Sequence, residues 1–305
     1  MKSIYIISIV IIVLLDILGC STEYKNQEKL ELQRAIDKQK KMDLKSRQES
    51  EAIIREIIAE KLNKNPKDLT DNDFAKVKEL EISEKELYDI KLIEKLINLQ
   101  KFELYRTQVS DLKPINGLTN LKSLWLRDTK IYDLGPIKKL TNLKEFRITH
   151  TQVSNLEPIR GLTNLQTLSL MVTKVSNLEP IKRLVNLSIL DIMNTQVSDL
   201  EPLKGLINLK VVLASRTNVT NLGPIKDLKK LKALYLDDTK VTDLKPIKDI
   251  LNLQTLSLRR TQVSDIEPVK SLTNLKKLNI EGCKKITDEQ VEDLQKTLPL
   301  LEISR

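Results

Sequence analysis

Residues 121–142 read LKSLWLRDTKIYDLGPIKKLTN, and the same pattern returns every 22 residues along most of the chain. Within this stretch Leu121, Leu124 and Leu126 give the spacing Leu-x-x-Leu-x-Leu, and the last two alternate with more polar positions. Alternation with a period of two predicts a strand with one buried face. A fixed period of this length is typical of a solenoid, in which stacked copies of one unit share a continuous core.

Three further positions of the repeat keep one residue type. Proline removes a backbone donor and fixes φ, so it suits a short 3₁₀ turn after the strand. The threonine hydroxyl can partner buried amides at the inward turn. The proline column is Pro114, Pro136, Pro158, Pro180, Pro202, Pro224, Pro246 and Pro268. The threonine column is Thr107, Thr129, Thr151, Thr173, Thr195, Thr217, Thr239 and Thr261. Asparagine precedes the first leucine of nearly every repeat, with Lys230 as the exception.

Composition narrows the class of protein. Aromatic residues make up 3% of the 305 residues, so the core must be aliphatic. The formal net charge of +9 comes with many acidic residues and without runs of basic and aromatic side chains. We therefore expect no nucleic-acid partner. The fold class we predict is an α/β solenoid, with a curved parallel sheet on the concave side and 3₁₀ or irregular segments on the convex side.

The repeat resembles the leucine-rich repeats of the bacterial internalins. The shared turn reads Asp111-Leu112-Lys113-Pro114-Ile115 in one copy and returns at residues 243–247. The resemblance covers residues 51–305, although threonine stands where that family usually has asparagine at the inward turn. It implies a surface-bound or extracellular protein that binds a protein partner on the concave face of the sheet.

The first twenty residues predict export. Lys2 precedes the apolar stretch 4–15, which is shorter than a membrane-spanning helix needs. The segment Ile17-Leu18-Gly19-Cys20 resembles a bacterial lipobox, so Cys20 is the expected lipidation site and membrane anchor, at the cell surface or outer membrane. Asp16 and Leu18 are unusual there, and an uncleaved signal anchor stays open. The direction in which the anchored protein faces is also open.

We divide the chain into a signal peptide (1–19), a charged stalk or linker (20–50), a helical N-terminal cap with the first strand (51–84), the repeats (85–282) and a C-terminal cap (283–305). Residues 21–50 fit a solvated helix, a flexible tether or a coiled-coil dimer, and we expect a monomeric solenoid. Ser50 is expected to cap a helix over 51–62. Thr70 with Asp73, and Thr287 with Gln290, predict capping boxes. Cys283 takes the threonine column, which predicts a buried thiol.

Side chains that alternate with the buried leucines should decorate the concave face. In the middle repeats these outward-facing side chains are apolar. In the outer repeats they are aromatic and charged groups, which are typical of binding hot spots. His150, the only histidine, also falls on this face but predicts no ligand by itself. The candidate partner-binding residues are Tyr105, Trp125, Arg127, Arg147, Met171, Ile189, Met193, Leu213, Tyr235 and Arg259.

No pattern in the sequence predicts catalysis, a metal site or a cofactor. The glycines are isolated, there is one histidine, and the adjacent Asp237 and Asp238 should diverge on a strand. The function predicted is that of a membrane-anchored surface lipoprotein whose concave face binds a protein or glycan of host or envelope origin. The alternative is a structural or envelope-organising lipoprotein without a dedicated ligand.

Overall fold

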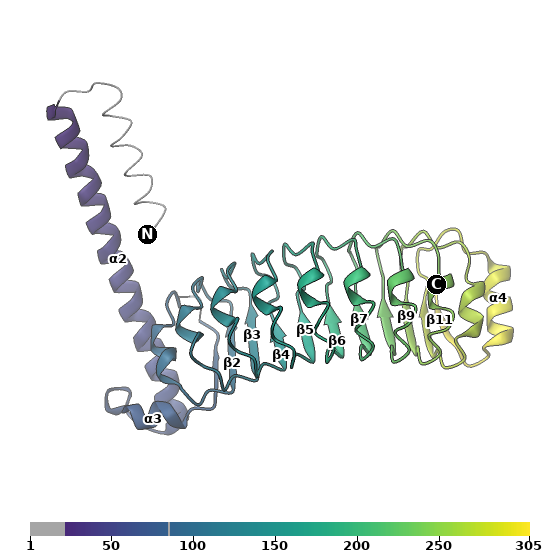
Figure 1. Cartoon of the computed structure of the whole chain (residues 1–305), viewed down its shortest axis with the longest axis horizontal. Helices are drawn as coiled ribbons and strands as arrows, with labels where there is room; N and C mark the ends of the chain where they lie inside the picture. The colour runs from purple at the N-terminus through teal and green to yellow at the C-terminus, as the bar shows by residue number, and fades with distance from the viewer. Residues whose placement is uncertain (1–21, 85) are drawn as a thin grey trace.

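The computed structural model describes residues 22–84 and 86–305. Their centre is one parallel sheet of eleven strands, in which each strand pairs with its neighbours in chain order (Figure 1). The strands are β1 Glu79–Ile82, β2 Lys101–Tyr105, β3 Ser123–Arg127, β4 Glu145–Arg147, β5 Thr167–Ser169, β6 Ile189–Asp191, β7 Val211–Leu213, β8 Ala233–Tyr235, β9 Thr255–Ser257, β10 Lys277–Asn279 and β11 Glu302–Ser304. The predicted solenoid fold is confirmed.

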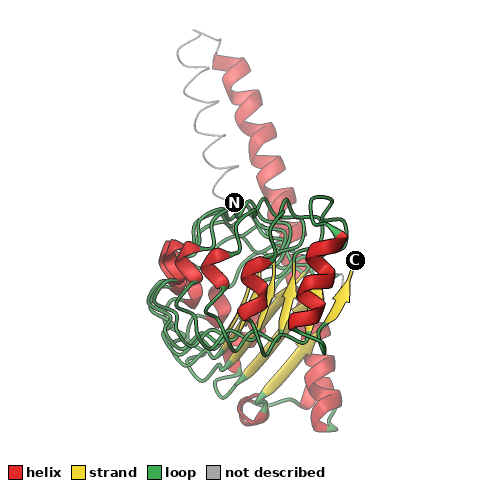
Figure 2. Cartoon of the chain, turned by 90° about the vertical axis from the view of Figure 1, so that its right-hand side faces the viewer, coloured by secondary structure: helices red, strands yellow, loops and turns green. Residues whose placement is uncertain are grey.

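The register of the sheet follows from the repeat. Leu124 lies opposite Phe146, and Leu168 lies opposite Leu190, so residues one repeat apart in sequence are neighbours in space. Equal repeat lengths therefore align every column of the sequence into a column on the sheet. Seen along the solenoid, the strands line one side and short helical turns line the other (Figure 2).

The convex side carries a series of short 3₁₀ helices. Proline occupies the first or second position of η3 to η10. The backbone N–H at these positions has no acceptor within the helix, so proline, which lacks an N–H, costs no hydrogen bond there. The helices are η1 Pro66–Asp68, η2 Lys91–Lys95, η3 Lys113–Ile115, η4 Gly135–Ile137, η5 Glu157–Ile159, η6 Glu179–Ile181, η7 Glu201–Leu203, η8 Gly223–Ile225, η9 Lys245–Ile247 and η10 Glu267–Ser271.

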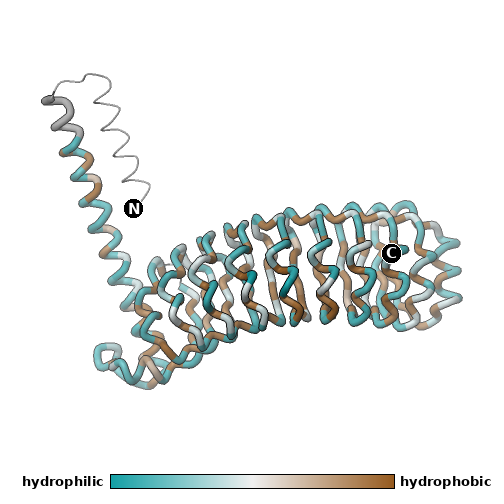
Figure 3. Tube along the Cα trace, viewed as in Figure 1, coloured by the Kyte–Doolittle hydropathy of each residue, from teal (hydrophilic) through white to brown (hydrophobic). Residues whose placement is uncertain are grey.

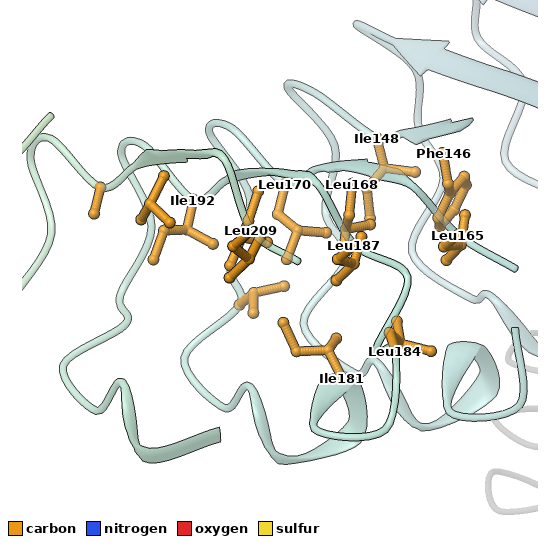
Figure 4. Close-up of a cluster of buried hydrophobic side chains, with 14 of the residues drawn as sticks. Phe146, Ile148, Leu165, Leu168, Leu170, Ile181, Leu184, Leu187, Ile192 and Leu209 are labelled. Atoms are coloured by element: carbon orange, nitrogen blue, oxygen red, sulfur yellow. The ribbon is translucent and has the colours of Figure 1, made fainter. Parts of the chain in front are cut away.

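A continuous aliphatic core fills the space between the strands and the 3₁₀ helices. Leucine, isoleucine and valine of each repeat pack against the same positions of the next one (Figure 4). Phe102 and Phe146 are the only phenylalanines inside the described repeats, and both are fully buried. Figure 3 shows apolar (brown) and polar (teal) positions alternating along each coil and recurring at matching places from one coil to the next.

Two ladders of side-chain hydrogen bonds stabilise the stack. The asparagine of each repeat donates through Nδ2 to a backbone carbonyl 23 residues earlier, as Asn186 does to Thr163 at 2.9 Å. Lys230 interrupts this ladder and instead donates to Asn208 Oδ1 at 2.7 Å. In the threonine column, Thr195 Oγ1 donates to the carbonyl of Ile192 at 2.6 Å. The asparagines thus satisfy loop carbonyls along the stack, and the threonine hydroxyls do the same from Thr151 to Thr239.

The N-terminal cap begins with a single long helix, α2, over Thr22–Leu62. Its first part projects from the end of the solenoid, and its last part packs on the first repeats (Figure 1). The prediction that Ser50 begins a helix is wrong, because Ser50 lies inside α2 and is fully buried. Its Oγ accepts the backbone N–H groups of Tyr88 at 3.1 Å and Asp89 at 3.2 Å, so it joins the helix to the solenoid.

The two predicted capping boxes are confirmed. Thr70 caps α3 (Asp71–Lys76) and Thr287 caps α4 (Asp288–Thr297). The buried Asp73 carboxylate accepts hydrogen bonds from Lys64 at 2.8 Å and Lys76 at 3.0 Å, which hold the pKa of Asp73 well below its ordinary value. At the other end α4 and β11 cover the last repeat, and the buried Cys283 donates through Sγ to the Leu258 carbonyl at 2.9 Å.

Cys20 and the whole predicted export segment lie outside the described residues. Within 22–84 and 86–305, none of the helices combines the length and the apolar character that crossing a membrane requires. The expected domain divisions remain predictions, although α2 runs without a break through the division at residue 50.

Candidate functional site on the concave face

The exposed face of the sheet, called here the concave face, is built from positions that alternate with buried leucines. In β3, for example, Leu124 and Leu126 point into the core while Ser123 and Trp125 point outward. Because the register repeats, outward residues of neighbouring strands form continuous columns. All ten candidate binding residues lie in these columns, on the strands or two residues beyond a strand end.

Aromatic and cationic side chains gather at the N-terminal end of this face. Lys101 Nζ lies 4.8 Å from the ring centroid of Trp125, and the guanidinium carbon of Arg147 lies 4.3 Å from it. Tyr105 is approached in the same way by Arg127, at 5.0 Å. These cation–π distances fix the rings and the cations relative to one another. We call Lys101, Tyr105, Trp125, Arg127 and Arg147 the aromatic cluster.

Two donors in the aromatic cluster have no acceptor among the described residues. They are Trp125 Nε1 and Arg147 Nε, and both atoms are shielded from solvent. Shielded donors without partners are rare, because each leaves its desolvation cost uncompensated. The two residues are opposite each other in the pairing of β3 and β4. The cluster is therefore packed but incompletely hydrogen-bonded.

An apolar patch occupies the middle of the concave face. Ile189 is 36% exposed, and the other members are partly exposed. The parts of the concave face on either side of the patch carry charged side chains, such as Arg147 and Arg259. The patch consists of Met171, Val172, Ile189, Met193, Val211 and Leu213.

One member of the apolar patch has an unfavourable backbone conformation. The position directly before the threonine column has positive φ in every repeat from Arg106 to Gly282. Arginine, aspartate, histidine, asparagine and glycine fill it elsewhere, but Val172 occupies it with a φ of 56°. A β-branched residue in the left-handed region is strained, and asparagine tolerates that region far better. Asn194 occupies the equivalent position one repeat later, with a φ of 53°.

Asp191 is a buried acid in the middle of this patch, and the sequence pattern did not single it out. Its side chain accepts a hydrogen bond from Ser169 Oγ at 2.7 Å and one from the backbone N–H of Met193 at 3.1 Å. Burial raises the pKa of Asp191 above its ordinary value, against the opposing effects of these bonds and of the Arg147 charge. Asp191 lies in the same column of the sheet as Trp125 and Arg147, so the 22-residue register could have placed it on the concave face.

The C-terminal end of the face is a network of acids and arginines. Asp237 accepts from Ser215 Oγ at 3.2 Å and from the backbone N–H of Arg259 at 2.9 Å. Asp238 instead receives two hydrogen bonds from Arg260, each 2.6 Å long, and these lower the pKa of Asp238. The two neighbouring carboxylates thus accept hydrogen bonds from different partners. Tyr235 lies on the strand before them, next to Leu213.

Within 22–84 and 86–305, no group of three or more histidine, cysteine, aspartate or glutamate side chains is placed to hold a metal ion. His150 contacts one acid, with Nδ1 3.4 Å from Asp128 Oδ1. What the concave face offers is a packed aromatic cluster, an apolar patch with a buried carboxyl, and a charged network in a row.

Comparison with known proteins agrees with this architecture. A family model described as leucine-rich repeats in two copies matches residues 119–161, 163–205 and 251–296. No curated protein matches the sequence.

Among solved structures, an internalin (InlF) of Listeria monocytogenes is 25% identical, covers 83% of this chain and 88% of its own, and gives a TM-score of 0.66. Internalin C2 of the same organism is 28% identical, covers 75% of this chain and 92% of its own, and gives 0.61. A leucine-rich-repeat protein of Leptospira interrogans is 26% identical and gives 0.68, covering 72% of this chain and 57% of its own. With the eleven-stranded sheet, these matches identify the chain as a leucine-rich-repeat solenoid similar to the internalins.

Proposed function

We propose that this protein is a membrane-anchored surface lipoprotein whose concave face binds a protein partner of host or envelope origin, without catalysis. The observation that carries the proposal is the apolar patch, which leaves six apolar side chains facing solvent between two charged ends. Extended concave surfaces are what repeat solenoids commonly use for binding. Exposed apolar patches rimmed by polar groups are typical of interaction sites.

Val172 adds a second argument for the patch. Its left-handed conformation costs free energy that the asparagine at the equivalent position of the next repeat avoids. Residues in disfavoured backbone conformations cluster at binding and catalytic sites, because there the side chain contributes something that stability alone would not select. A valine in this position enlarges the patch formed by Met171 and Met193. We infer that it is kept for contact with the partner.

The aromatic cluster would supply the strongest contacts. Tryptophan, tyrosine and arginine dominate binding free energy at protein interfaces, and their fixed positions limit the entropy lost on binding. Methionines in the adjacent patch adapt their shape to an irregular surface. A protein partner therefore fits this face better than a small molecule does. A glycan would use the aromatic rings but would leave the patch uncovered.

Membrane attachment is proposed from Ile17-Leu18-Gly19-Cys20 alone. Lipid on Cys20 would hold the chain at the membrane, and the long helix α2 (Thr22–Leu62) would separate the solenoid from the bilayer. Growth of the source cells with a labelled fatty acid tests this step. We expect label on the wild-type chain and none on the Cys20→Ala variant. An unlabelled wild-type chain in the soluble fraction would contradict the anchor.

A capture experiment tests the binding face. The full chain, purified in mild detergent, is used to capture surface proteins, and the retained proteins are compared with those held by a Met171→Asp/Leu213→Asp variant. A Val185→Asp/Ile207→Asp variant is the matched control, because these residues are 48% and 55% exposed outside the concave face. We expect a partner that the wild type and the control retain and the concave variant loses. Equal retention by all three, with folding verified by circular dichroism, would contradict the proposal.

A structural role without a dedicated ligand is the second candidate. It is favoured by α2, where Leu30, Met42 and Leu44 are each more than half exposed at 52%, 57% and 56%. These residues could join two copies of the chain through their projecting helices. Sedimentation of the full chain and of a Leu30→Glu/Met42→Glu/Leu44→Glu variant distinguishes the two candidate functions. Self-association of the wild type that the variant loses would support the structural role.

A further inference from the structure

We propose that Arg147, stacked on Trp125, receives the carboxylate of a single acidic side chain that apolar residues flank in the protein partner. The inference rests on the proposed binding function of the concave face and names the chemistry of one contact within it. It is carried by three observations: the stacking geometry, the unused hydrogen-bonding capacity of Arg147, and its position at the border of the apolar patch.

Stacking prepares the Arg147 guanidinium for binding. Its central carbon lies 4.3 Å from the indole centroid, and Lys101 Nζ lies 4.8 Å from the same ring. A guanidinium held against an aromatic ring keeps its N–H edge free, so little side-chain entropy is lost when a ligand binds. The side chain is 44% exposed, so the outer nitrogens can be reached from solvent.

The guanidinium of Arg147 makes no hydrogen bond to a described protein acceptor. Its nearest carboxylate is that of Glu145, whose Oε2 lies 3.9 Å from Nη2 and thus beyond hydrogen-bonding distance. Arg147 Nε is shielded and without an acceptor, as is Trp125 Nε1 beside it. A planar guanidinium with unfilled donors matches the two oxygens of a carboxylate, and such charge-assisted pairs are among the strongest hydrogen bonds in proteins.

The other two candidate arginines of the concave face lie closer to an acid than Arg147 does. Arg259 Nε, which like Arg147 Nε is shielded and lacks a hydrogen-bond acceptor, still lies 3.1 Å from Glu281 Oε2, and Arg127 Nε lies 3.4 Å from Asp128 Oδ2. Arg147 therefore has the longest separation from an acid of the three. An incoming carboxylate would have to displace an existing ion pair at Arg127 or Arg259, and it would meet a weaker competitor at Arg147.

The surroundings favour one carboxylate rather than an acidic tract. Glu103 and Glu145 lie beside the cluster, with Glu103 paired to Lys101 at 2.6 Å. Asp191 lies on the other side, across Ser169, with its oxygens engaged by Ser169 and Met193. A run of acids would meet these charges, whereas a single acid flanked by apolar residues would place its carboxylate on Arg147 and its neighbours on the patch.

Trp125 is the only tryptophan of the chain, so its fluorescence reports on this site alone. The probe is a blocked peptide, Leu-Gly-Glu-Gly-Leu, and the comparison is the same peptide with glutamine in place of glutamate. Both are titrated into the full chain in mild detergent. We expect a saturable fluorescence change whose midpoint is at least about tenfold lower in concentration for the glutamate peptide. A blocked glucuronate disaccharide forms a third arm with the same carboxylate on a sugar.

Variants decide whether Arg147 is the receptor. Arg147→Gln should abolish the difference between the two peptides, and Arg147→Lys should keep a reduced part of it, because lysine retains the charge and loses the planar donors. Arg183→Gln is the control and should preserve the difference, because Arg183 is exposed on the convex side, just after η6 (Glu179–Ile181). Equal binding of both peptides to the wild type, an Arg147→Gln response like that of the wild type, or a response to the glucuronate probe alone would overturn the inference.

The outcome is separable from that of the proposed function. If the captured partner is lost on Met171→Asp/Leu213→Asp substitution but held normally by Arg147→Gln, then concave-face binding stands and the carboxylate contact is wrong. If the glutamate peptide binds through Arg147 and no partner depends on the apolar patch, then the contact stands and the proposed function is wrong.

Discussion

Ser169 Oγ donates a hydrogen bond of 2.7 Å to Asp191 Oδ2, across two neighbouring strands and in the middle of the apolar patch of Met171, Val172, Ile189, Met193, Val211 and Leu213. Asp191 is only 9% exposed, and its carboxylate has no salt bridge among the described residues. Burial raises the pKa of Asp191, so in this environment the charged form is less favourable than in the unfolded chain. A buried acid of this kind lowers stability once it ionises.

The first prediction concerns the pH dependence of unfolding. Because the pKa of Asp191 is higher in the folded chain, the folded state binds more protons between the unfolded and folded pKa values, and its stability falls as pH rises through that window. Asp191→Asn keeps an acceptor for the Met193 N–H and removes the charge. We expect the variant to melt at a higher temperature than the wild type at neutral pH, and the difference to shrink at pH values below the ordinary range of aspartate.

Thermal melts followed by circular dichroism from pH 3 to pH 8 measure this effect. The control is Asp249→Asn, since Asp249 is exposed. That substitution should leave the wild-type profile unchanged. A lower melting temperature of Asp191→Asn at neutral pH would mean that the carboxylate stabilises the fold, contrary to the prediction.

Much of the architecture was predictable because the repeat makes local and global patterns agree. Leucine spacing predicted the strands, proline predicted the 3₁₀ turns, and Thr70 and Thr287 predicted the caps. The prediction that Ser50 is a helix N-cap was wrong. Its hydrogen-bond partners Tyr88 and Asp89 are 38 and 39 residues away, and no local sequence pattern indicates contacts at that distance.

The concave face was predictable as a set of positions but not as a set of contacts. Alternation placed Trp125 and Arg147 on one face, and the 22-residue register makes them neighbours. The stacking depends on side-chain rotamers, which no spacing encodes. The burial of Asp191 likewise depends on the side chains of adjacent strands.

The second prediction compares two threonines of the threonine column that differ in whether the hydroxyl makes a hydrogen bond. From Thr151 to Thr239 each hydroxyl donates to the carbonyl three residues earlier, after strands of three residues. After the five-residue strand β3 (Ser123–Arg127), Thr129 Oγ1 is buried and has no partner. Thr195→Val should therefore lower the free energy of unfolding by about 1 to 3 kcal/mol, because it leaves a buried carbonyl without its donor.

Thr129→Val is the matched substitution and should cost nothing or stabilise slightly, since it removes a hydroxyl that already lacks a partner. Urea denaturation of the two variants beside the wild type gives both values. An equal loss in the two variants would indicate that the column stabilises the fold through methyl packing rather than through its hydrogen bonds.

A third prediction concerns the gap in the asparagine ladder. At every neighbouring repeat the asparagine donates to a carbonyl 23 residues earlier, as Asn208 does to Val185 and Asn252 does to Lys229. Lys230→Asn would place a donor against the carbonyl of Ile207 and complete the series. We expect a gain of about 0.5 to 1 kcal/mol in urea denaturation, and a comparable loss for Asn186→Ala. No change in the Lys230→Asn variant would show that the bond from Lys230 to Asn208 is an equivalent substitute.

The fourth prediction connects stability with function through Val172. Val172→Asn should raise the free energy of unfolding by about 1 to 2 kcal/mol, because asparagine tolerates the positive φ that strains valine. The reciprocal change, Asn194→Val, should lower it by a similar amount at the equivalent position. If Val172 is kept for contact with the partner, the stabilised Val172→Asn variant should also capture that partner more weakly. A variant that is more stable and binds equally well would leave the valine without a functional reason and would weaken the argument that the apolar patch is the binding site.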